Sequence, residues 1–552
     1  MKRWEILNKL KLNSAQQTVK GIIDILLENR GIHTKKEIES FLNPKLTDIT
    51  LDSVGIDKTA VKKTVDRINT AINTQEQVII YGDYDVDGLT ASAILWETLF
   101  SLKSNVKPYI PHRLDEGYGL SIKGIDSLLT QYPETKLIIT VDNGIVANIA
   151  VDYANQKGIQ VIITDHHVKS DILPNALHIV HTTNLCGAGI AWILAQELKT
   201  IMENDNLLEL AALGTIADLV PLKNANRIIV KYGLEKLTRT KRAGLLALFN
   251  ESGIMNGSIG SYEVGHIIAP RLNATGRMNT AMDSLRLLCT KDSNRAQQLA
   301  SLLGATNKER QIVMMEAVKH ATLSVHDRSE LKKLLVVTDD SYPEGVIGLV
   351  AGRLVEEFYR PSIVISKGKK ISKGSVRSIN GFNIIEFLRQ SSEYFINIGG
   401  HPMAAGFTIE TNKIEKMTEV LENFAHEIMK EDLFIRTIKI DCEIPLDIID
   451  DEFFSSIQTL SPFGMGNPEP AFLSKNLVVK NIRSLGKDGK HLRLSVSQKS
   501  TVIEAIAFGF GEQSKSINTG DIVDLVYTVD ENKWNGIRKL QLKVKDIVKT
   551  KN

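Results

Sequence analysis

The chain has few cysteines and no long uncharged apolar run, and these absences exclude several classes of protein. Its cysteines are Cys186, Cys289 and Cys442, and none has the Cys-x-x-Cys spacing of a zinc site or a redox motif. No segment approaches the roughly 20 apolar residues of a membrane-spanning helix. The isolated thiols fit a reducing compartment, so we expect a cytoplasmic protein.

An excess of charge of one sign is also lacking. Lysine and arginine number 67 and aspartate and glutamate 65, which gives a net charge of +2. This balance neither requires nor excludes nucleic acid as a ligand, so any basic groove must be local. The length of 552 residues exceeds what one hydrophobic core usually serves, so we expect several domains.

Three short β-branched apolar runs are each followed by acidic residues or histidines. Residues 78–80, 137–139 and 161–163 have the pattern of strands buried on both faces of a parallel sheet. The polar residues that follow them are Asp83, Asp85 and Asp87, then Asp142, and then Asp165, His166 and His167. Because the carboxyl ends of parallel strands share one edge of the sheet, these side chains should converge. Asp oxygens mixed with His nitrogens suit Mn²⁺ or Mg²⁺.

Each of these residues, taken alone, has a simpler interpretation. An Asp after a strand is often a turn former or a helix cap, and Gly88 with Thr90 could form the turn into a helix that begins near Ala91. The return of the same strand-then-acid pattern along the chain favours a metal site.

These residues resemble the DHH phosphoesterase superfamily. Residues 83–88 are similar to its first motif, Asp142 to its second, residues 165–167 to the DHH signature, and residues 213–222 to a fourth motif that contains Asp218. Segments 269–278, 374–378, 399–407 and 462–468 are similar to the RecJ family of bacterial single-strand-specific exonucleases. The smaller oligoribonucleases and cyclic-dinucleotide phosphodiesterases share only the DHH and Gly-Gly-His segments.

The resemblance, with the sequence pattern, implies an α/β fold in which a parallel-sheet DHH domain and a DHHA1 α/β domain are joined by a long helix and followed by an OB-type β-barrel. The expected regions are an N-terminal helical cap (1–53), the DHH domain (54–222), a helical region with the connecting helix (223–330), the DHHA1 domain (331–430) and the OB domain (438–548). Amphipathic helices are expected from Gln17 to Leu27 and from Lys35 to Leu42, and the long helix from Asp283 to Val325.

The expected chemistry is hydrolysis of a phosphodiester with two divalent ions, Mn²⁺ or Mg²⁺. The metal ligands are predicted to be Asp83, Asp85, Asp87, Asp142, His166, His167 and Asp218. All of these except Asp83, together with His401, form the predicted catalytic set. Asp165 could instead orient a histidine. The spacing of the motifs does not indicate which Asp bridges the ions.

The predicted substrate contacts are Arg113, Arg271, Asn273, Arg277, Gln311, Arg353, Ser375, Arg377 and His401. By resemblance, Arg113, Ser375 and Arg377 surround a 5′-phosphate and His401 contacts the scissile phosphate. Simpler alternatives are a plain β-turn at residues 374–378, a structural role for His401 and a surface position for Arg113. In the barrel, Phe508, Phe510 and Tyr527 offer aromatic faces for single-strand binding, and we expect the barrel to be a module separate from the metal site.

The implied function is 5′→3′ degradation of single-stranded DNA to mononucleotides in DNA repair and recombination. The implied partners are single-stranded DNA, a single-strand-binding protein and a RecQ-type helicase. Two alternatives stay open: an oligoribonuclease or cyclic-dinucleotide phosphodiesterase with the same metals, and a non-catalytic replication scaffold.

Overall fold

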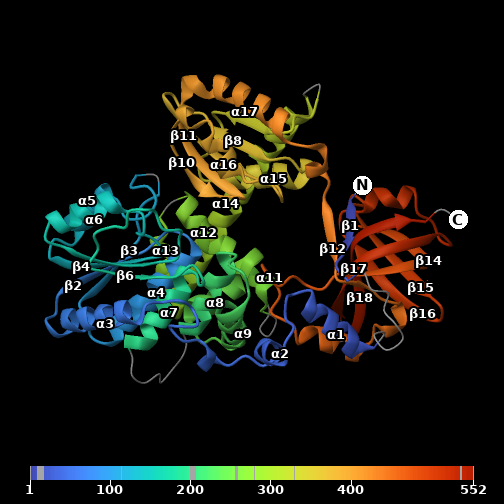
Figure 1. Ribbon diagram of the computed structural model, residues 1–552, viewed down its shortest axis with the longest axis horizontal. Helices are drawn as coiled ribbons and strands as arrows, with labels where there is room; N and C mark the ends of the chain where they lie inside the picture. The colour runs from blue at the N-terminus through green and yellow to red at the C-terminus, as the bar shows by residue number, and fades with distance from the viewer. Residues whose placement is uncertain are drawn as a thin grey trace.

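The computed structural model arranges the chain as three bodies around a central group of helices (Figure 1). It describes residues 2–8, 18–113, 115–198, 207–254, 259–278, 280–327, 330–534 and 537–550. A parallel sheet with its helices lies on the left of the view, a second α/β unit at the top and a β-barrel on the right. Gln17, the first residue of one expected helix, lies outside the described residues.

The first sheet is parallel throughout, as its apolar runs predict. Its strands are β2 (Gln77–Tyr81), β3 (Val106–Tyr109), β4 (Thr135–Val141), β5 (Gln160–Asp165) and β6 (His178–His181). They lie in the order β3-β2-β4-β5-β6, so the direction of the connections reverses between β2 and β4. Ligands of open α/β sheets bind at this switch point, outside the carboxyl ends of the strands. Asp83 and Asp142 therefore follow the two strands that flank the switch point.

Helices bury both faces of this sheet. Val78 and Ile80 pack into a core shared with α3, α4 and α7, whereas Ile79 and Tyr81 pack into a second core shared with α5 and α6. These helices are α3 (Lys58–Asn73), α4 (Val86–Ser101), α5 (Ile122–Gln131), α6 (Asn148–Gln156) and α7 (Gly187–Leu198). The two-sided burial explains why the strands are continuously apolar rather than alternating.

The helix after β2 begins earlier than expected. It starts at Val86 rather than near Ala91, because the Asp85 carboxylate accepts the Gly88 N–H at 3.0 Å and caps the helix. Asp87 consequently lies in the first turn of α4 instead of in a loop. The simple interpretation of Asp85 as a cap is correct, and it does not conflict with a role in the metal site.

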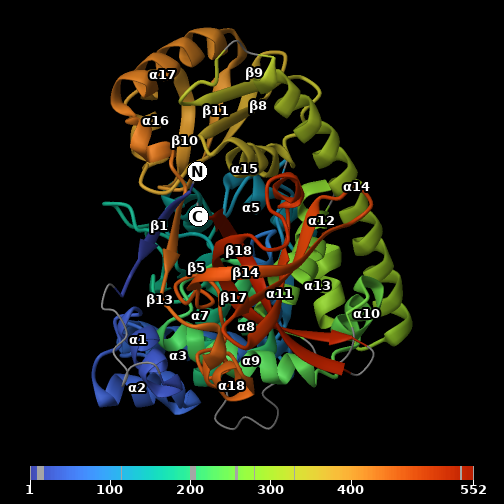
Figure 2. The ribbon, with the colours of Figure 1, turned by 90° about the vertical axis from the view of Figure 1, so that its right-hand side faces the viewer.

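A helical region connects the first sheet to the second α/β unit. Its helices are α8 (Leu207–Ala217), α9 (Asn224–Thr238), α10 (Ala243–Ser252), α11 (Ser261–Glu263), the π-helix η2 (Val264–Ile268), α12 (Ala269–Met278), α13 (Met282–Cys289) and α14 (Ser293–His326). The expected start of the long helix at Asp283 is wrong. Helix α13, which contains Asp283, ends at Cys289. Asp292 then caps a new helix, α14, by accepting the N–H groups of Asn294 and Arg295. From there α14 runs up to the second unit (Figure 2).

The second unit is a mixed five-stranded sheet in the order β10-β11-β9-β8-β7. Its elements are β7 (Leu335–Asp339), α15 (Ile347–Phe358), β8 (Ser362–Ser366), β9 (Ile371–Arg377), α16 (Ile384–Arg389), β10 (Phe395–His401), β11 (Ala404–Glu410) and α17 (Ile414–Ile428). Ser375 and Arg377 lie within β9, so the alternative of a plain β-turn there is wrong. In β11, Gly406 pairs with Ser375 and Ala404 with Arg377, and Ala404 also pairs with His401 of β10.

The expected OB-type barrel is confirmed. Its elements are β13 (Cys442–Glu443), α18 (Asp451–Gln458), β14 (Phe472–Leu485), β15 (His491–Gln498), β16 (Thr501–Ala507), β17 (Ile522–Trp534) and β18 (Ile537–Lys549). The order β14-β15-β16-β18-β17 closes because β17 also pairs with β14. Closure removes the exposed strand edges of an open sheet.

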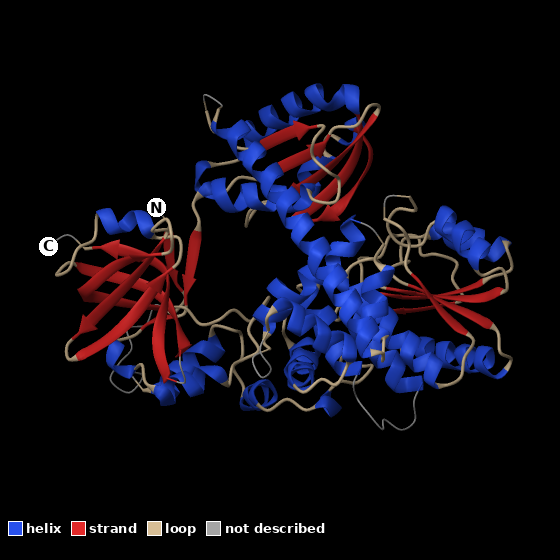
Figure 3. Cartoon of the chain, turned by 180° about the vertical axis from the view of Figure 1, so that it is seen from behind, coloured by secondary structure: helices blue, strands red, loops and turns tan. Residues whose placement is uncertain are grey.

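The N-terminal residues are built into the barrel body. Strand β1 (Arg3–Ile6) pairs in parallel with β12 (Thr437–Ile440), the strand that leads from the second unit to the barrel (Figure 3). Helices α1 (Val19–Glu28) and α2 (Lys35–Leu42) follow, and Ile22, Leu26 and Leu27 share one core with the barrel residues. The N-terminal helices therefore share the core of the barrel, and removal of the barrel would expose α1. That the barrel is a module separate from the metal site stays a prediction.

No helix among the described residues has the length and apolar character required to cross a membrane. Cys186, Cys289 and Cys442 are all free thiols, and Cys186 and Cys442 are buried.

Candidate metal centre and phosphate site

The seven predicted metal ligands converge at the switch point of the first sheet. Their ligand atoms form three overlapping groups, and within each group the atoms lie within 4.8 Å of one another. The groups are Asp83 with Asp85 and Asp142, Asp87 with His166 and Asp218, and Asp142 with His166 and His167. Because Asp142 and His166 are each shared between two groups, the three groups form one continuous centre.

The Asp87 carboxylate is fixed by the start of a second helix. Its Oδ2 accepts the Gly187 N–H at 2.6 Å and its Oδ1 accepts the Ala188 N–H at 2.8 Å, both in the first turn of α7. Helix N-termini stabilise negative charge through their free N–H groups and dipole. Asp87 is 1% exposed, so α7 holds a carboxylate that would otherwise be costly to bury.

His166 lies among three of the carboxylates. Its Nε2 is 3.0 Å from Asp142 Oδ1, 3.7 Å from Asp218 Oδ2 and 3.8 Å from Asp87 Oδ2. Burial lowers the pKa of His166, which favours the neutral imidazole. A neutral imidazole offers a nitrogen lone pair to a metal.

Asp165 contacts histidine rather than the centre itself. Its Oδ1 lies 2.7 Å from His167 Nδ1, and its Oδ2 accepts the Ile145 N–H. Burial opposes the charge of His167, but the hydrogen bond and charge of Asp165 raise the pKa of His167 to about 8. With Nδ1 bound to Asp165, the opposite nitrogen Nε2 is left for a ligand, and it now lies 3.1 Å from the Tyr118 hydroxyl. This is the arrangement of a carboxylate that orients a metal-binding histidine.

Two glycines allow the backbone to approach the acids closely. A Cβ on Gly88 would lie 2.7 Å from the Asp83 nitrogen, and a Cβ on Gly187 would lie 2.6 Å from the Asp142 Cβ. Both contacts are too short for any side chain, so α4 and α7 reach the carboxylates only through glycine.

The charges of this centre are not balanced by the described residues. Burial and the neighbouring carboxylates raise the pKa of Asp83, Asp85 and Asp142, and they raise the pKa of Asp218 to about 8. The buried Asp83 Oδ1 accepts no hydrogen bond, and neither does Asp142 Oδ1, although His166 Nε2 lies 3.0 Å from it. Buried oxygens without a donor are rare, and divalent cations supply what such oxygens lack. The mixed oxygen and nitrogen donor set fits Mn²⁺ or Mg²⁺.

Four arginines gather beside the centre. Burial and the charges of Arg113, Arg310 and Arg377 lower the pKa of Arg277 to about 10. Arg113 also lies over the ring of Tyr84, with 5.1 Å from its guanidinium carbon to the ring centroid. Tyr84 stands between Asp83 and Asp85 in the sequence. No carboxylate of the described chain forms a salt bridge with any of these four guanidinium groups. A cluster of arginines without salt-bridge partners predicts a binding site for an anion.

Strand β9 of the second unit contributes Arg377 and Ser375 to this cluster. Arg377 Nη1 lies 3.5 Å from the Ser375 hydroxyl, and the Arg277 guanidinium donates to the Gly345 carbonyl just before α15. The structure thus brings together four of the predicted substrate residues, which are Arg113, Arg277, Ser375 and Arg377.

Arg310 was missed by the sequence analysis although a signal was present. It is 8% exposed and follows Leu299, Leu303 and Thr306 on the buried stripe of α14. Its Nε has no hydrogen-bond partner. Its Nη2 donates to Asn307 Oδ1 at 2.9 Å, but an amide oxygen does not neutralise a buried guanidinium, so the arrangement favours an anion as a further partner.

The other predicted substrate residues do not join the cluster. Arg271 and Asn273 lie in α12, where Arg271 donates to the Ile267 carbonyl and the buried Asn273 Oδ1 has no partner. Gln311 is exposed, and Arg353 pairs with Glu356 at 2.5 Å on the surface. His401 is exposed at the end of β10, and no described contact joins it to the acidic centre. Their substrate contacts stay predictions.

The aromatic residues predicted in the barrel divide into core and surface. Tyr527 is fully buried and its hydroxyl lies 2.7 Å from the Ser474 hydroxyl, so the idea that it stacks on a base is wrong. Phe510 packs against the barrel core. Phe508 is 52% exposed beside His491, with 5.3 Å between the ring centroids.

Comparisons with known proteins agree on the family. Residues 77–215 match the DHH family N-terminal domain, residues 331–427 the DHHA1 domain and residues 440–546 the RecJ OB domain. The chain is 37% identical to the single-stranded-DNA-specific exonuclease RecJ of Bacillus subtilis (strain 168), over 99% of this chain and 70% of that protein.

Solved structures give the same result. The crystal structure of RecJ in complex with Mn²⁺ from Thermus thermophilus has a TM-score of 0.83 at 28% identity, over 100% of this chain and 80% of the other. A crystal structure of exonuclease RecJ bound to manganese has a TM-score of 0.59 at 32% identity, over 67% of this chain and 95% of the other.

Proposed function

The chain belongs to the RecJ family of the DHH superfamily, and we propose that it is a single-stranded-DNA-specific exonuclease that hydrolyses the strand in the 5′→3′ direction. The observation that carries this proposal is the convergence of seven ligand side chains at one switch point, next to four arginines without carboxylate partners.

The acidic centre is the proposed site for two Mn²⁺ or Mg²⁺ ions. Asp83, Asp85, Asp87, Asp142, His166, His167 and Asp218 would hold them. Such ions lower the pKa of water and stabilise charge on the phosphate and the leaving oxygen. The chain supplies the geometry: α7 fixes Asp87, and Asp165 orients His167 through Nδ1.

The arginine cluster is the proposed site of the 5′-phosphate. Arg113, Arg277, Arg310 and Arg377 offer forked N–H donors, and the Ser375 hydroxyl adds one more. Because Arg113 lies on Tyr84 between two of the metal ligands, a captured terminal phosphate would be next to the acidic centre. Capture of the end beside the hydrolytic centre favours release of mononucleotides from the 5′ end.

Single-stranded DNA is the proposed partner of the barrel, where the exposed ring of Phe508 would stack on a base. A single-strand-binding protein and a RecQ-type helicase are proposed as protein partners from the family resemblance. We place the protein in the cytoplasm, where its free thiols stay reduced.

The alternatives have less support. A small-substrate phosphodiesterase would not need the barrel, which matches the RecJ OB domain. A non-catalytic scaffold would not need seven converging ligands.

The test uses single-stranded and duplex DNA labelled at the 5′ or the 3′ end, with Mn²⁺, Mg²⁺ or EDTA. We expect labelled mononucleotide to appear first from 5′-labelled single strands, and only with a divalent ion. Early release of the 3′ label, or equal cleavage of duplex, would contradict the proposal. Preference for dinucleotides over long strands would favour the small-substrate alternative.

A further inference from the structure

The loop at residues 462–468 of the barrel body packs against the segment that carries Asp218. Asp218 directly follows α8, and Leu222 lies four residues later. The Leu222 N–H donates to the Met465 carbonyl at 2.7 Å. A Cβ on Gly466 would lie 2.8 Å from the Pro221 Cβ, so the two backbones are in direct contact. A loop of the barrel body thus holds the chain just beyond a proposed metal ligand.

The carboxylate of Asp218 is held by fewer contacts than those of Asp85 and Asp87. Asp85 accepts the Gly88 N–H and caps α4, and Asp87 accepts the Gly187 and Ala188 N–H groups of α7. By contrast, no hydrogen bond from a described residue reaches the Asp218 carboxylate, and its side chain is 25% exposed. The next residue, Leu219, has a left-handed φ of +59° and is exposed, so it adds strain rather than packing. On the preceding side the Asp218 N–H donates to the Gly214 carbonyl at 2.9 Å and continues α8, so on the following side the position of Asp218 depends on how residues 219–222 are held.

The loop is itself held rigidly by Asn467. This side chain is 1% exposed, and its Nδ2 donates to the carbonyls of Leu460 at 2.9 Å and Pro462 at 2.8 Å. Its Oδ1 accepts the Arg30 Nε–H at 2.9 Å. Asn467 also exchanges backbone hydrogen bonds with Gly464.

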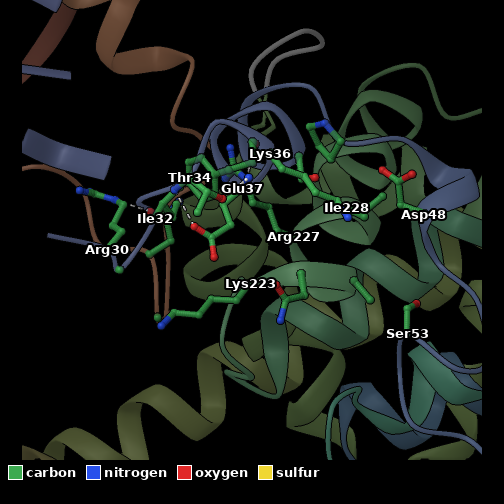
Figure 4. Close-up of a pocket in the computed structure, with 18 residues that line it drawn as sticks. Arg30, Ile32, Thr34, Lys36, Glu37, Asp48, Ser53, Lys223, Arg227 and Ile228 are labelled. Carbon is green, nitrogen blue, oxygen red and sulfur yellow. Dashed lines mark hydrogen bonds between the residues drawn. The ribbon is translucent and has the colours of Figure 1, made fainter. Parts of the chain in front are cut away.

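Arg227 of α9 joins the chain just before the loop to the catalytic body. Its guanidinium carbon lies 3.8 Å from the centroid of the Phe41 ring, and its Nη1 donates to the Leu460 carbonyl at 2.9 Å. Arg30 and Arg227 both line a cavity of about 720 Å³ between α2, α9 and the loop (Figure 4). Gly466 and Asn467 border the same cavity. On this side Arg30 holds the loop through Asn467 and the Pro468 carbonyl, and Arg227 holds the residue that comes two positions before the loop.

We propose that the loop at residues 462–468 is a positioning element for Asp218, so that the barrel body sets the metal affinity of the centre. The inference rests on the proposed function, because Asp218 is a metal ligand only in that proposal. Coupling of this kind is reciprocal, so metal binding should in turn stabilise the docked loop.

The test compares two glycine substitutions in the full-length protein. Gly466→Ala places a methyl group against Pro221 at a residue with φ of +73°. Gly520→Ala is the matched control, because Gly520 lies in the same body with φ of +93° and would meet no atom within 4 Å. Both variants carry the strain of a left-handed alanine, but only Gly466→Ala disturbs the segment after Asp218.

Mn²⁺ affinity is measured from the electron paramagnetic resonance signal of the free ion. We expect Gly466→Ala to weaken binding about 10-fold, the usual order for losing support of a metal ligand, and Gly520→Ala to bind as wild type. Saturating Mn²⁺ should restore kcat in Gly466→Ala, because the proposed defect is in ligand position. Mn²⁺ should also slow amide hydrogen exchange in residues 462–468 of the wild-type protein.

Equal Mn²⁺ affinities for Gly466→Ala and Gly520→Ala would overturn the inference. If Gly466→Ala is unfolded by circular dichroism, Asn467→Ala replaces it with the same criterion, since it removes the hydrogen bonds inside the loop. A wild-type protein that binds no Mn²⁺ would instead contradict the proposed function, so the two failures are distinguishable.

Discussion

Proton release on metal binding gives the sharpest test of the acidic centre. Burial and the neighbouring carboxylates raise the pKa of Asp218 from its usual 3.8 to about 8. At pH 7 about nine-tenths of the metal-free molecules then carry a proton on Asp218. A divalent ion can bind the carboxylate only after this proton leaves, so binding should release close to one proton from Asp218 alone.

The pH dependence follows from the same proton. For each proton released, the Mn²⁺ affinity should rise about tenfold per pH unit between pH 5 and 7, equivalent to about 1.4 kcal/mol. His167, whose pKa is raised to about 8, should release a second proton if it ligates an ion. Asp218→Asn should remove one proton from the count and leave the contribution of His167.

The assay is isothermal titration of Mn²⁺ into EDTA-treated and dialysed protein, in buffers of different ionisation enthalpy. The dependence of the heat on the buffer gives the number of protons released. An affinity that is constant between pH 5 and 7, or binding without proton release, would refute the reasoning.

The stability of the metal-free protein should show the matching trend. The unfolded chain loses the Asp218 proton near pH 3.8, whereas the folded chain keeps it to about pH 8. Between these values the unfolded state binds fewer protons, so the free energy of unfolding should fall as the pH rises. Thermal unfolding in EDTA should show this fall, and Asp218→Asn should make it less steep.

Three further predictions address the other parts of the site. Asp142→Ala should reduce hydrolysis by at least 10²-fold and keep single-strand binding within a few-fold, because it removes a shared metal ligand but none of the arginines. Mn²⁺-dependent cleavage near the wild-type rate would argue against the metal centre. Arg377→Ala should slow hydrolysis of 5′-phosphorylated strands about 10-fold or more relative to 5′-hydroxyl strands, since it removes a charged donor worth about 1.5–3 kcal/mol. Equal slowing of both substrates would assign Arg377 a structural role. Phe508→Ala should weaken binding of long single strands by about 1–3 kcal/mol and leave the affinity for very short oligonucleotides unchanged, as measured by fluorescence anisotropy. An unchanged affinity for long strands would show that Phe508 does not contact DNA.

Local patterns along the chain were sufficient to predict the acidic centre. Continuous β-branched runs indicate strands buried on both faces, and parallel strands align their carboxyl ends, so Asp83, Asp142 and His166 had to approach one another. The resemblance to a known family added Asp218 and identified the second α/β unit and the β-barrel as DHHA1 and OB domains. These inferences need only the periodicity of strands and helices and the direction of their connections.

Tertiary packing decided what periodicity does not encode. The start of α4 at Val86 depends on the Asp85 cap, and the partner of Asp87 is a helix that begins 100 residues later. Arg113 and Arg310 are far apart along the chain, and both act on Arg277 because the loop after β3 and α14 approach the same side of the centre. The docking of residues 462–468 beside Asp218 could not be predicted either, because the contact joins backbone atoms of Leu222 and Met465. A backbone hydrogen bond does not identify its partner in the sequence, because every residue except proline carries the same N–H and carbonyl groups. Gly466 permits the close approach to Pro221, but a glycine does not indicate which segment approaches it.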